Sequence, residues 1–208
     1  MNLLIFGASG HTGRHVIREA LARGHRVSAF ARDPEKLGDF GAALSLIRGD
    51  VGDATAVAQA VPGHDAVVST LGVGTPLRHD PKVIAGIEHI LAAMQVAKLK
   101  RLIYQSFIGV EDSRAAVGFV LRFIAPLPLR HEIADHEVKE ALIKASATDW
   151  TIVRPPKLTN GPRTTYRVGL DITTRVPVPT LSRASVAHFI VNELEAPQYI
   201  RKVARLLR

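Results

Sequence analysis

Gly7, Gly10 and Gly13 directly follow the first apolar segment of the chain, residues 3–6, and open a stretch of helical spacing over residues 12–23. Three glycines at this spacing between a strand and a helix are typical of a turn that binds the pyrophosphate of a dinucleotide. The first glycine permits the tight turn, the second lets the backbone approach the phosphates, and the third lets the helix pack closely on the strand. The sequence therefore predicts a dinucleotide site behind the N-terminal strand.

The remaining residues of this loop strengthen the prediction. Ser9 and Thr12 carry hydroxyl groups, and His11 stands between them. The free N–H groups and the positive dipole end of the following helix attract phosphates. The alternative, that the glycines only make a turn, does not account for their position between strand and helix.

The second predicted strand, residues 26–32, indicates which dinucleotide is bound. Sites that prefer NAD place an acidic residue about 20 residues beyond the loop, on the ribose 2′-hydroxyl. Here the strand ends with Ala31 and Arg32, and no acidic residue lies within it. A guanidinium matches the geometry of a 2′-phosphate, so the sequence predicts NADP(H) in preference to NAD(H). The alternative is an ordinary solvated arginine at a strand end.

Short apolar segments alternate with helical patterns over the first three quarters of the chain. Strands that are apolar on both faces and separated by helices predict an α/β protein with a doubly wound parallel sheet of the Rossmann type. We expect one domain over residues 1–208, in which about 155–208 form a small substrate-side region that is irregular up to a last helix. The further predicted strands are 43–48, 65–71, 101–106 and 150–154, and the further helices are 53–60, 81–98, 132–145 and 183–194.

Composition limits the functional classes. The chain has no cysteine, which excludes disulfides and thiolate chemistry, and a formal net charge of +8. Its basic residues are dispersed except for Arg201, Lys202, Arg205 and Arg208, so binding of an anionic cofactor explains the charge better than binding of nucleic acid. The N-terminus lacks the pattern of a signal peptide, and no apolar segment is long enough to span a membrane. We expect a cytoplasmic protein.

Five segments resemble one known family. They are Gly-Ala-Ser-Gly-His-Thr-Gly-Arg (7–14), Ala-Arg-Asp-Pro-Glu-Lys-Leu (31–37), Arg-Gly-Asp-Val (48–51), Asp-Ala-Val-Val-Ser-Thr-Leu-Gly (65–72) and Asp-Trp-Thr-Ile-Val-Arg-Pro-Pro (149–156). They look like the NAD(P)H-binding, NmrA-like atypical short-chain dehydrogenases, and within that family the biliverdin reductase B, or flavin reductase, branch. The resemblance runs from residue 1 to about 195.

The resemblance implies roles for the matching residues. Asp50 and Val51 would lie against the adenine, although Asp50 is equally explained as a turn residue. Ser106 would face the nicotinamide, and Lys157 stands where the flavin reductases have a histidine beside the substrate pocket. An alternative for Lys157 is a solvated loop lysine. The other implied residues are Thr70, Leu71 and Gly72 in the cofactor cleft, and Pro155 and Pro156, which would contact the cofactor through their backbone.

The catalytic residues of ordinary short-chain dehydrogenases are missing. Those enzymes use a tyrosine with a lysine four residues later, and none of the three tyrosines here has that partner. His136, in the helix that would hold the pair, could donate a proton, although a half-exposed histidine on an amphipathic helix is the more ordinary interpretation. Asp135 stands where a zinc motif beginning at His131 and Glu132 requires a second histidine, so no metal site is expected.

The apolar segment 115–129 follows the fifth predicted strand, where open α/β sheets place ligand crevices. It would form a lid or pocket wall for a flat aromatic substrate, a subunit interface, or an ordinary part of the core. We expect an NADPH-dependent oxidoreductase that transfers hydride to a flavin, a quinone or a similar conjugated acceptor. The rival hypothesis is a non-catalytic, NAD(P)(H)-binding redox sensor with a protein partner. An epimerase or dehydratase of nucleotide sugars would need a longer C-terminal region.

Overall fold

The computed structural model describes residues 1–38, 40–41, 43–72, 81–116 and 126–208. Its centre is an eight-stranded sheet with the strand order β3-β2-β1-β4-β5-β6-β10-β8. All neighbouring strands are parallel except β10 and β8, which confirms the predicted Rossmann-type α/β fold. The strands are β1 Asn2–Phe6, β2 Arg26–Ala31, β3 Leu44–Arg48, β4 Ala66–Ser69, β5 Arg101–Gln105, β6 Asp149–Arg154, β8 Arg167–Gly169 and β10 Lys202–Leu207.

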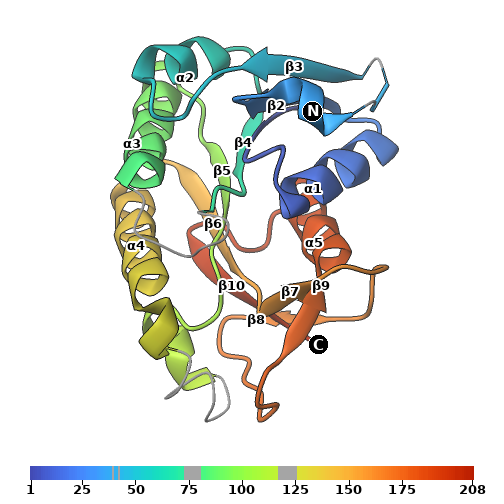
Figure 1. Cartoon of the computed structure of the whole chain (residues 1–208), viewed down its shortest axis with the longest axis vertical. Helices are drawn as coiled ribbons and strands as arrows, with labels where there is room; N and C mark the ends of the chain where they lie inside the picture. The colour runs from blue at the N-terminus through green and yellow to red at the C-terminus, as the bar shows by residue number, and fades with distance from the viewer. Residues whose placement is uncertain (39, 42, 73–80, 117–125) are drawn as a thin grey trace.

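Helices cover both faces of this sheet (Figure 1). One face holds α1 (His11–Ala22) and α5 (Arg183–Glu195), and the other holds α2 (Ala54–Ala60), α3 (Pro81–Val96) and α4 (Pro126–Ala145). Successive strand residues point to opposite faces, so strands buried on both sides must be apolar throughout. The two core clusters divide β1 in this way: Leu3 and Ile5 pack with α1 and α5, and Leu4 and Phe6 with α2 and α3. No helix in the described ranges is long and apolar enough to cross a membrane.

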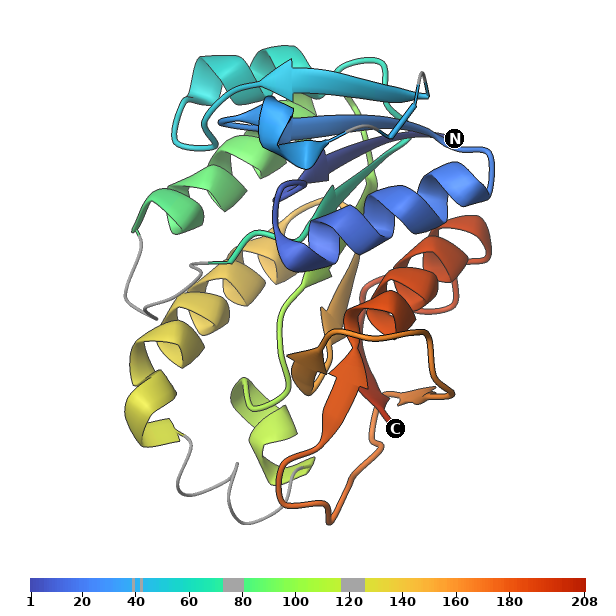
Figure 2. The same ribbon diagram turned by 45° about the vertical axis from the view of Figure 1, so that its right-hand side comes forward.

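The strand order reverses beside β1. The chain builds β2 and β3 on one side of β1, then crosses to β4, β5 and β6 on the other. Open α/β sheets bind ligands at such a reversal, outside the carboxyl ends of the strands. The glycine loop after β1 and residues 70–72 after β4 therefore meet there (Figure 2).

The C-terminal region is more regular than predicted. Lys202 and Arg205 of the basic cluster near the C-terminus belong to β10, which pairs with β6 on one side and β8 on the other. Ala204, Leu206 and Leu207 in it are fully buried, and Arg205 is ion-paired with Asp112. Charged residues between the apolar ones concealed this strand from a pattern search. A second, two-stranded sheet joins β7 (Lys157–Thr159) to β9 (Thr180–Ser182).

Helix α4 also differs from the prediction, because it begins at Pro126, six residues before the expected start at Glu132. Proline is tolerated in the first turn of a helix, where backbone N–H groups have no intrahelical partner. A 3₁₀ helix, η2 (Glu111–Ala116), follows β5. Most of the segment predicted as a lid or interface, residues 117–125, lies outside the described residues.

Candidate functional site

The glycine loop is shaped for close backbone contact. Gly7 has φ +75°, and a Cβ there would lie 2.7 Å from the carbonyl carbon of Thr70. A Cβ on Gly13 would lie 2.3 Å from the carbonyl oxygen of Gly7. Gly10 closes the turn by donating its N–H to Gly7 O at 3.0 Å, and as the N-cap of α1 it brings no side-chain cap. The first N–H groups of α1 therefore have no cap from the N-cap side chain, and helix starts with free N–H groups bind phosphates.

A cavity of about 310 Å³ opens at this loop. It gathers predicted residues from four separate segments of the chain. His11, Thr12 and Gly13 lie outside its wall: His11 is exposed, Thr12 is buried, and Gly13 packs on the loop backbone. The wall also contains residues that the sequence did not single out, of which Lys82 is charged. The lining residues are Gly7, Ser9, Gly10, Phe30, Ala31, Arg32, Gly49, Asp50, Val51, Thr70, Leu71, Gly72, Lys82 and Val83.

Arg32 gives this cavity an available positive charge. The side chain is exposed at the end of β2 and forms no ion pair with any residue that the structure describes. Its neighbour Asp33 is held instead by Lys36 at 2.8 Å, and hydrogen bonding to Lys36 outweighs a small burial effect and lowers the pKa of Asp33. A 2′-phosphate at this wall would therefore meet a guanidinium that no neighbouring carboxylate neutralises.

Arg14, which the sequence analysis did not select, connects the loop after Arg32 to the glycine loop. Its Nε donates to Ser9 O at 3.1 Å, and its two terminal nitrogens donate to Leu37 O and Lys36 O at 3.2 and 2.5 Å. Arg14 thus fixes the chain just beyond β2 relative to the start of α1. Its position immediately after the third glycine was the only signal in the sequence.

Two predicted cofactor residues shape the cavity with side chains that are already hydrogen-bonded. Asp50 Oδ1 accepts from Gly52 N at 2.9 Å, as the turn interpretation expects, while the residue also lines the cavity. Thr70 Oγ1 donates toward Phe6 O and Gly7 O, at 3.3 and 3.2 Å. The bonds of Thr70 join the end of β4 to the glycine loop and hold these two parts of the cavity wall together.

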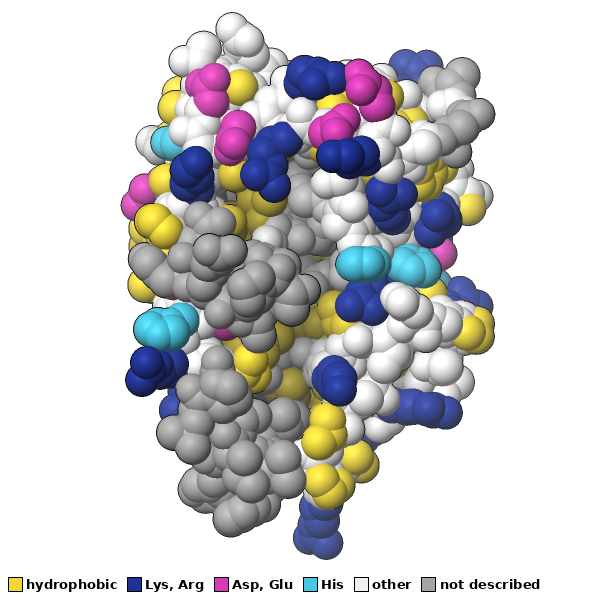
Figure 3. Space-filling model, viewed as in Figure 1, with side chains coloured by type: hydrophobic (Ala, Val, Ile, Leu, Met, Phe, Trp, Pro, Cys, Tyr) yellow, Lys and Arg dark blue, Asp and Glu magenta, His cyan; other side chains and the backbone are white. Residues whose placement is uncertain are grey.

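A second cavity, of about 470 Å³, shares Thr70, Leu71 and Gly72 with the first, so the two form one cleft. Figure 3 shows the hollowed face, with Lys and Arg side chains around its upper part and hydrophobic side chains lining its lower part. The second cavity is mainly apolar, with few polar groups on its wall, as is usual for small-molecule sites. Its other lining residues are Gln105, Ser106, Phe107, Ile108, Gly109, Leu129, Glu132, Ile133, His136, Pro155, Pro156, Lys157, Leu158 and Val178.

His136 is buried beside Ser106, so the expectation of a half-exposed histidine is wrong. Its side chain is 5% exposed, and its Nδ1 lies 2.8 Å from Tyr104 Oη and 3.3 Å from Ser106 Oγ. Burial, with smaller contributions from Lys139 and Arg154, holds the pKa of His136 well below its ordinary value. One ring nitrogen has a single hydrogen or lone pair, so the nearer Tyr104 occupies it and the Ser106 hydroxyl retains bonding capacity.

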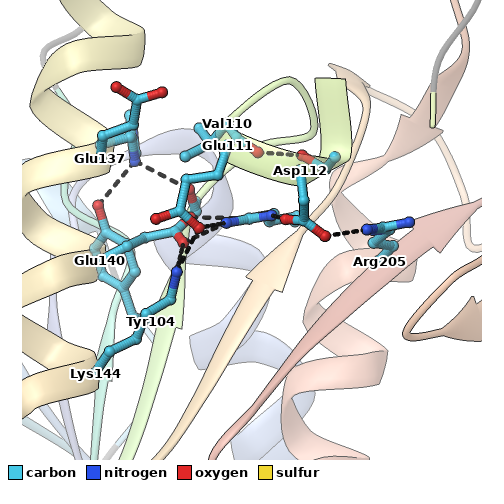
Figure 4. A network of polar contacts seen from close by, with 12 residues as sticks. Tyr104, Val110, Glu111, Asp112, Glu137, Glu140, Lys144 and Arg205 are labelled. Carbon is cyan, nitrogen blue, oxygen red and sulfur yellow. Dashed lines mark hydrogen bonds and ion pairs between the residues drawn. The ribbon is translucent and has the colours of Figure 1, made fainter. Parts of the chain in front are cut away.

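An ion-pair network centred on the buried pair of Arg154 and Glu140 joins α4, η2 and β6 (Figure 4). Arg154 is fully buried and binds Glu140 of α4, Asp112 and Glu111 of η2 at 2.6–2.9 Å. Burial alone would lower the pKa of Arg154, but its bonds to Glu140 and Asp112 raise it. Lys144 reaches Glu111 and Glu140 at 2.5 and 3.2 Å. The network fixes α4 and η2 against the end of β6. Pro155 and Pro156 follow β6 directly in the chain.

Two further ionisable groups line the second cavity. Lys157, on β7, is exposed, as its solvated alternative expects, and still belongs to the wall. Glu132 lies one turn before His136 on α4. The sequence analysis did not predict it as a site residue, although its helical spacing from His136 was visible. Burial raises the pKa of Glu132.

In the described part of the chain, no three His, Cys, Asp or Glu side chains are grouped to hold a metal ion.

The chain is similar to two reductases of known activity. It is 28% identical to the 2-alkyl-3-oxoalkanoate reductase of Stenotrophomonas maltophilia, over 95% of this chain and 67% of that protein. It is 30% identical to the (4-alkanoyl-5-oxo-2,5-dihydrofuran-3-yl)methyl phosphate reductase of Streptomyces griseus, over 74% of this chain and 46% of that protein. The chain thus spans between about half and two thirds of the length of these relatives.

Solved structures share the fold. A short-chain dehydrogenase/reductase of Veillonella parvula in complex with NADP superposes with a TM-score of 0.84 over 100% of this chain and 94% of that one, at 17% identity. At this identity the likeness concerns the fold. The model of the NAD(P)H-binding family matches residues 7–197, which include the glycine loop and both cavities. The chain belongs to the NAD(P)H-binding family of Rossmann-type proteins.

Proposed function

We propose that this protein is a cytoplasmic, NADPH-dependent reductase that transfers hydride to a small conjugated acceptor such as a flavin or a quinone. The observation that carries the proposal is the continuity of the cleft. The cavity at the glycine loop, beside the uncapped start of α1, continues past Thr70, Leu71 and Gly72 into a mainly apolar cavity that Ser106 lines.

The residues present fit a dinucleotide. The glycine loop and the start of α1 would hold the pyrophosphate, because the N-cap Gly10 has no side chain to occupy the first N–H groups of the helix. Asp50 and Val51 would line the adenine end, and Arg32 would bind the 2′-phosphate of NADP. When bound, the reduced nicotinamide supplies a hydride. Ser106 would border it, and the backbone of Pro155 and Pro156 would help to orient it.

The second cavity supports a flat, largely apolar acceptor. Its wall carries Phe107, Ile133 and Leu158 among other apolar side chains, and its volume lies in the range of small-molecule sites. The resemblance to flavin reductases supports a flavin or quinone as the acceptor. The two reductase relatives support a reduction reaction without specifying this acceptor. Lys157, at the wall and exposed, would meet an anionic group of the acceptor.

A redox sensor is the second candidate function. It is favoured by one observation: a tyrosine–lysine pair at the spacing of ordinary short-chain dehydrogenases does not occur in the sequence. A sensor would bind oxidised and reduced cofactor with different affinities, engage a protein partner and turn over neither form.

The test is oxidation of NADPH, followed by the loss of the cofactor's own absorbance, with FMN, FAD and a series of quinones. We expect turnover with at least one acceptor, and a loss of about tenfold or more in Ser106→Ala, with Ser45→Ala, an exposed serine of β3, as the control. Tight NADPH binding without turnover of any acceptor would contradict the reductase and favour the sensor.

A further inference from the structure

The ionisable groups on the wall of the second cavity differ in their ability to give up a proton. They are Glu132, His136 and Lys157. Reduction of a conjugated acceptor needs a proton at oxygen or nitrogen in addition to the hydride, and a general acid delivers it best when its pKa lies near the working pH. The proton donor must therefore be the one of these three groups that can hold a proton in contact with the acceptor.

His136 is unsuited to that task. Its side chain is almost completely buried, and Tyr104 approaches its Nδ1 at 2.8 Å. Burial and the nearby charges of Lys139 and Arg154 keep its pKa well below the ordinary value, which disfavours the imidazolium form that would act as the general acid. Its contacts with Tyr104 and Ser106 make it a positioning residue behind the site.

Glu132 has the opposite character. It lies four residues before His136, so both side chains stand on one face of α4 and line the same cavity. Its side chain is half-buried at the wall of this mainly apolar cavity, and in the described ranges it forms no hydrogen bond or ion pair, although the charge of Lys139 acts on it. A carboxyl in an apolar cavity without a partner favours its neutral, protonated form.

We infer that Glu132 is the proton donor of the reductase, an inference that rests on the proposed function. The O–H bond of its carboxyl breaks, a new bond to hydrogen forms on the acceptor oxygen or nitrogen, and the acceptor also receives the hydride of the reduced cofactor. The carboxylate that remains takes a proton from solvent before the next turnover.

The surrounding charges are consistent with a carboxyl that stays protonated at higher pH than usual. Burial is the main cause of its raised pKa; Asp135 on its own helix adds to it, and Lys139 opposes it. From the other elements, Tyr104 of β5 and Arg154 of β6 act on His136, and Lys157 of β7 lines the same cavity.

The first test does not depend on turnover. The carboxyl carbons of glutamate, labelled with carbon-13, are titrated by NMR with and without NADP⁺, and the signal missing in Glu132→Gln is assigned to Glu132. We expect this carboxyl to titrate above its ordinary value of 4.5. Titration at or below that value would overturn the inference while leaving the reductase proposal intact.

The second test uses the acceptor that supports turnover. We expect kcat of the wild type to fall as pH rises through the pKa of Glu132, Glu132→Gln to lose about 100-fold in kcat at neutral pH with NADPH affinity kept, and Glu132→Asp to restore part of it. The matched control is Glu137→Gln, the same change on the same helix at a carboxyl that pairs with Arg114 outside the cavity.

The outcomes separate the two proposals. Equal turnover in Glu132→Gln and Glu137→Gln would overturn the proton-donor role and keep the reductase. If the wild type turned over no acceptor at all, the reductase would be contradicted, and the proton donor with it.

Discussion

Glu140 binds Arg154 through both of its carboxylate oxygens, at 3.0 and 2.6 Å, and neither side chain is exposed to solvent. The pair joins the middle of α4 to the last residue of β6. His136 lies one turn before Glu140 on α4, and Pro155 directly follows Arg154, so the pair fixes two walls of the second cavity relative to each other. The fold and the candidate site thus depend on the same contact.

Glu140→Gln should destabilise the protein strongly. Glu140 is the only fully buried carboxylate that pairs with Arg154 among the described residues, and its loss leaves Arg154 with the more exposed Glu111 and Asp112. We therefore expect a loss near the lower end of the range for breaking a buried pair, about 3 kcal/mol in the free energy of unfolding. Glu35→Gln, which breaks the exposed pair between Glu35 and Arg48, should cost less than about 1 kcal/mol. Urea denaturation measures both variants, and similar small losses would contradict the structural role of the buried pair.

Stability should fall on acidification because of His136. Its pKa in the folded protein is lowered by burial, whereas the unfolded chain titrates near 6.5. Between the folded-state pKa and 6.5 the unfolded state binds more protons, so the free energy of unfolding declines as pH falls through that window, by up to about 1.4 kcal/mol per pH unit.

The pKa values of His15 and His188 are also lowered, chiefly by burial, so the informative quantity is a difference between variants. His136→Gln should show a shallower decline below pH 6.5 than the wild type. His131→Gln, which changes an exposed histidine of the same helix, should show the decline of the wild type. Parallel curves for all three proteins would mean that His136 is accessible to protons in the folded state.

Gly13→Ala should disturb the glycine loop. The added Cβ would lie 2.3 Å from Gly7 O, a contact that the backbone must move to relieve, and overpacking of this kind costs about 1–3 kcal/mol. The control is Gly72→Ala, where a Cβ would meet no described atom within 4 Å. Thermal unfolding compares their stabilities, and an unchanged melting temperature in Gly13→Ala would show that the loop is looser than the structure indicates.

The sequence predicted the parts of the fold that depend on local patterns. Glycine spacing located the loop after β1, and apolar strands between helices predicted the parallel sheet and its helical layers. It did not predict β10, because Arg205 and its neighbours suggest a solvated tail until Asp112, far away in the chain, provides the partner for Arg205. Pairing over such a separation leaves no local signal.

The residues of the candidate site also fall into those that local patterns predict and those that depend on long-range contacts. Gly7, Gly10 and Arg32 were found by position relative to predicted strands, and the structure places them on one cavity wall. The contact of Tyr104 with His136 spans 32 residues, so burial of the histidine was not visible in the sequence. Glu132 stands at helical spacing from His136, but only the cavity shows that this helix face borders a ligand site.

The most direct test of the account is calorimetric titration of the wild type and Arg32→Ala with NADPH and NADH. We expect one cofactor per chain, tighter binding of NADPH by the wild type, and a loss of about tenfold or more in NADPH affinity for Arg32→Ala, with NADH affinity nearly unchanged. Arg26→Ala, at the opposite end of β2, should bind both cofactors as the wild type does. Equal losses for NADPH and NADH in Arg32→Ala would contradict recognition of the 2′-phosphate, and binding of neither cofactor by the wild type would contradict the assignment of the cleft.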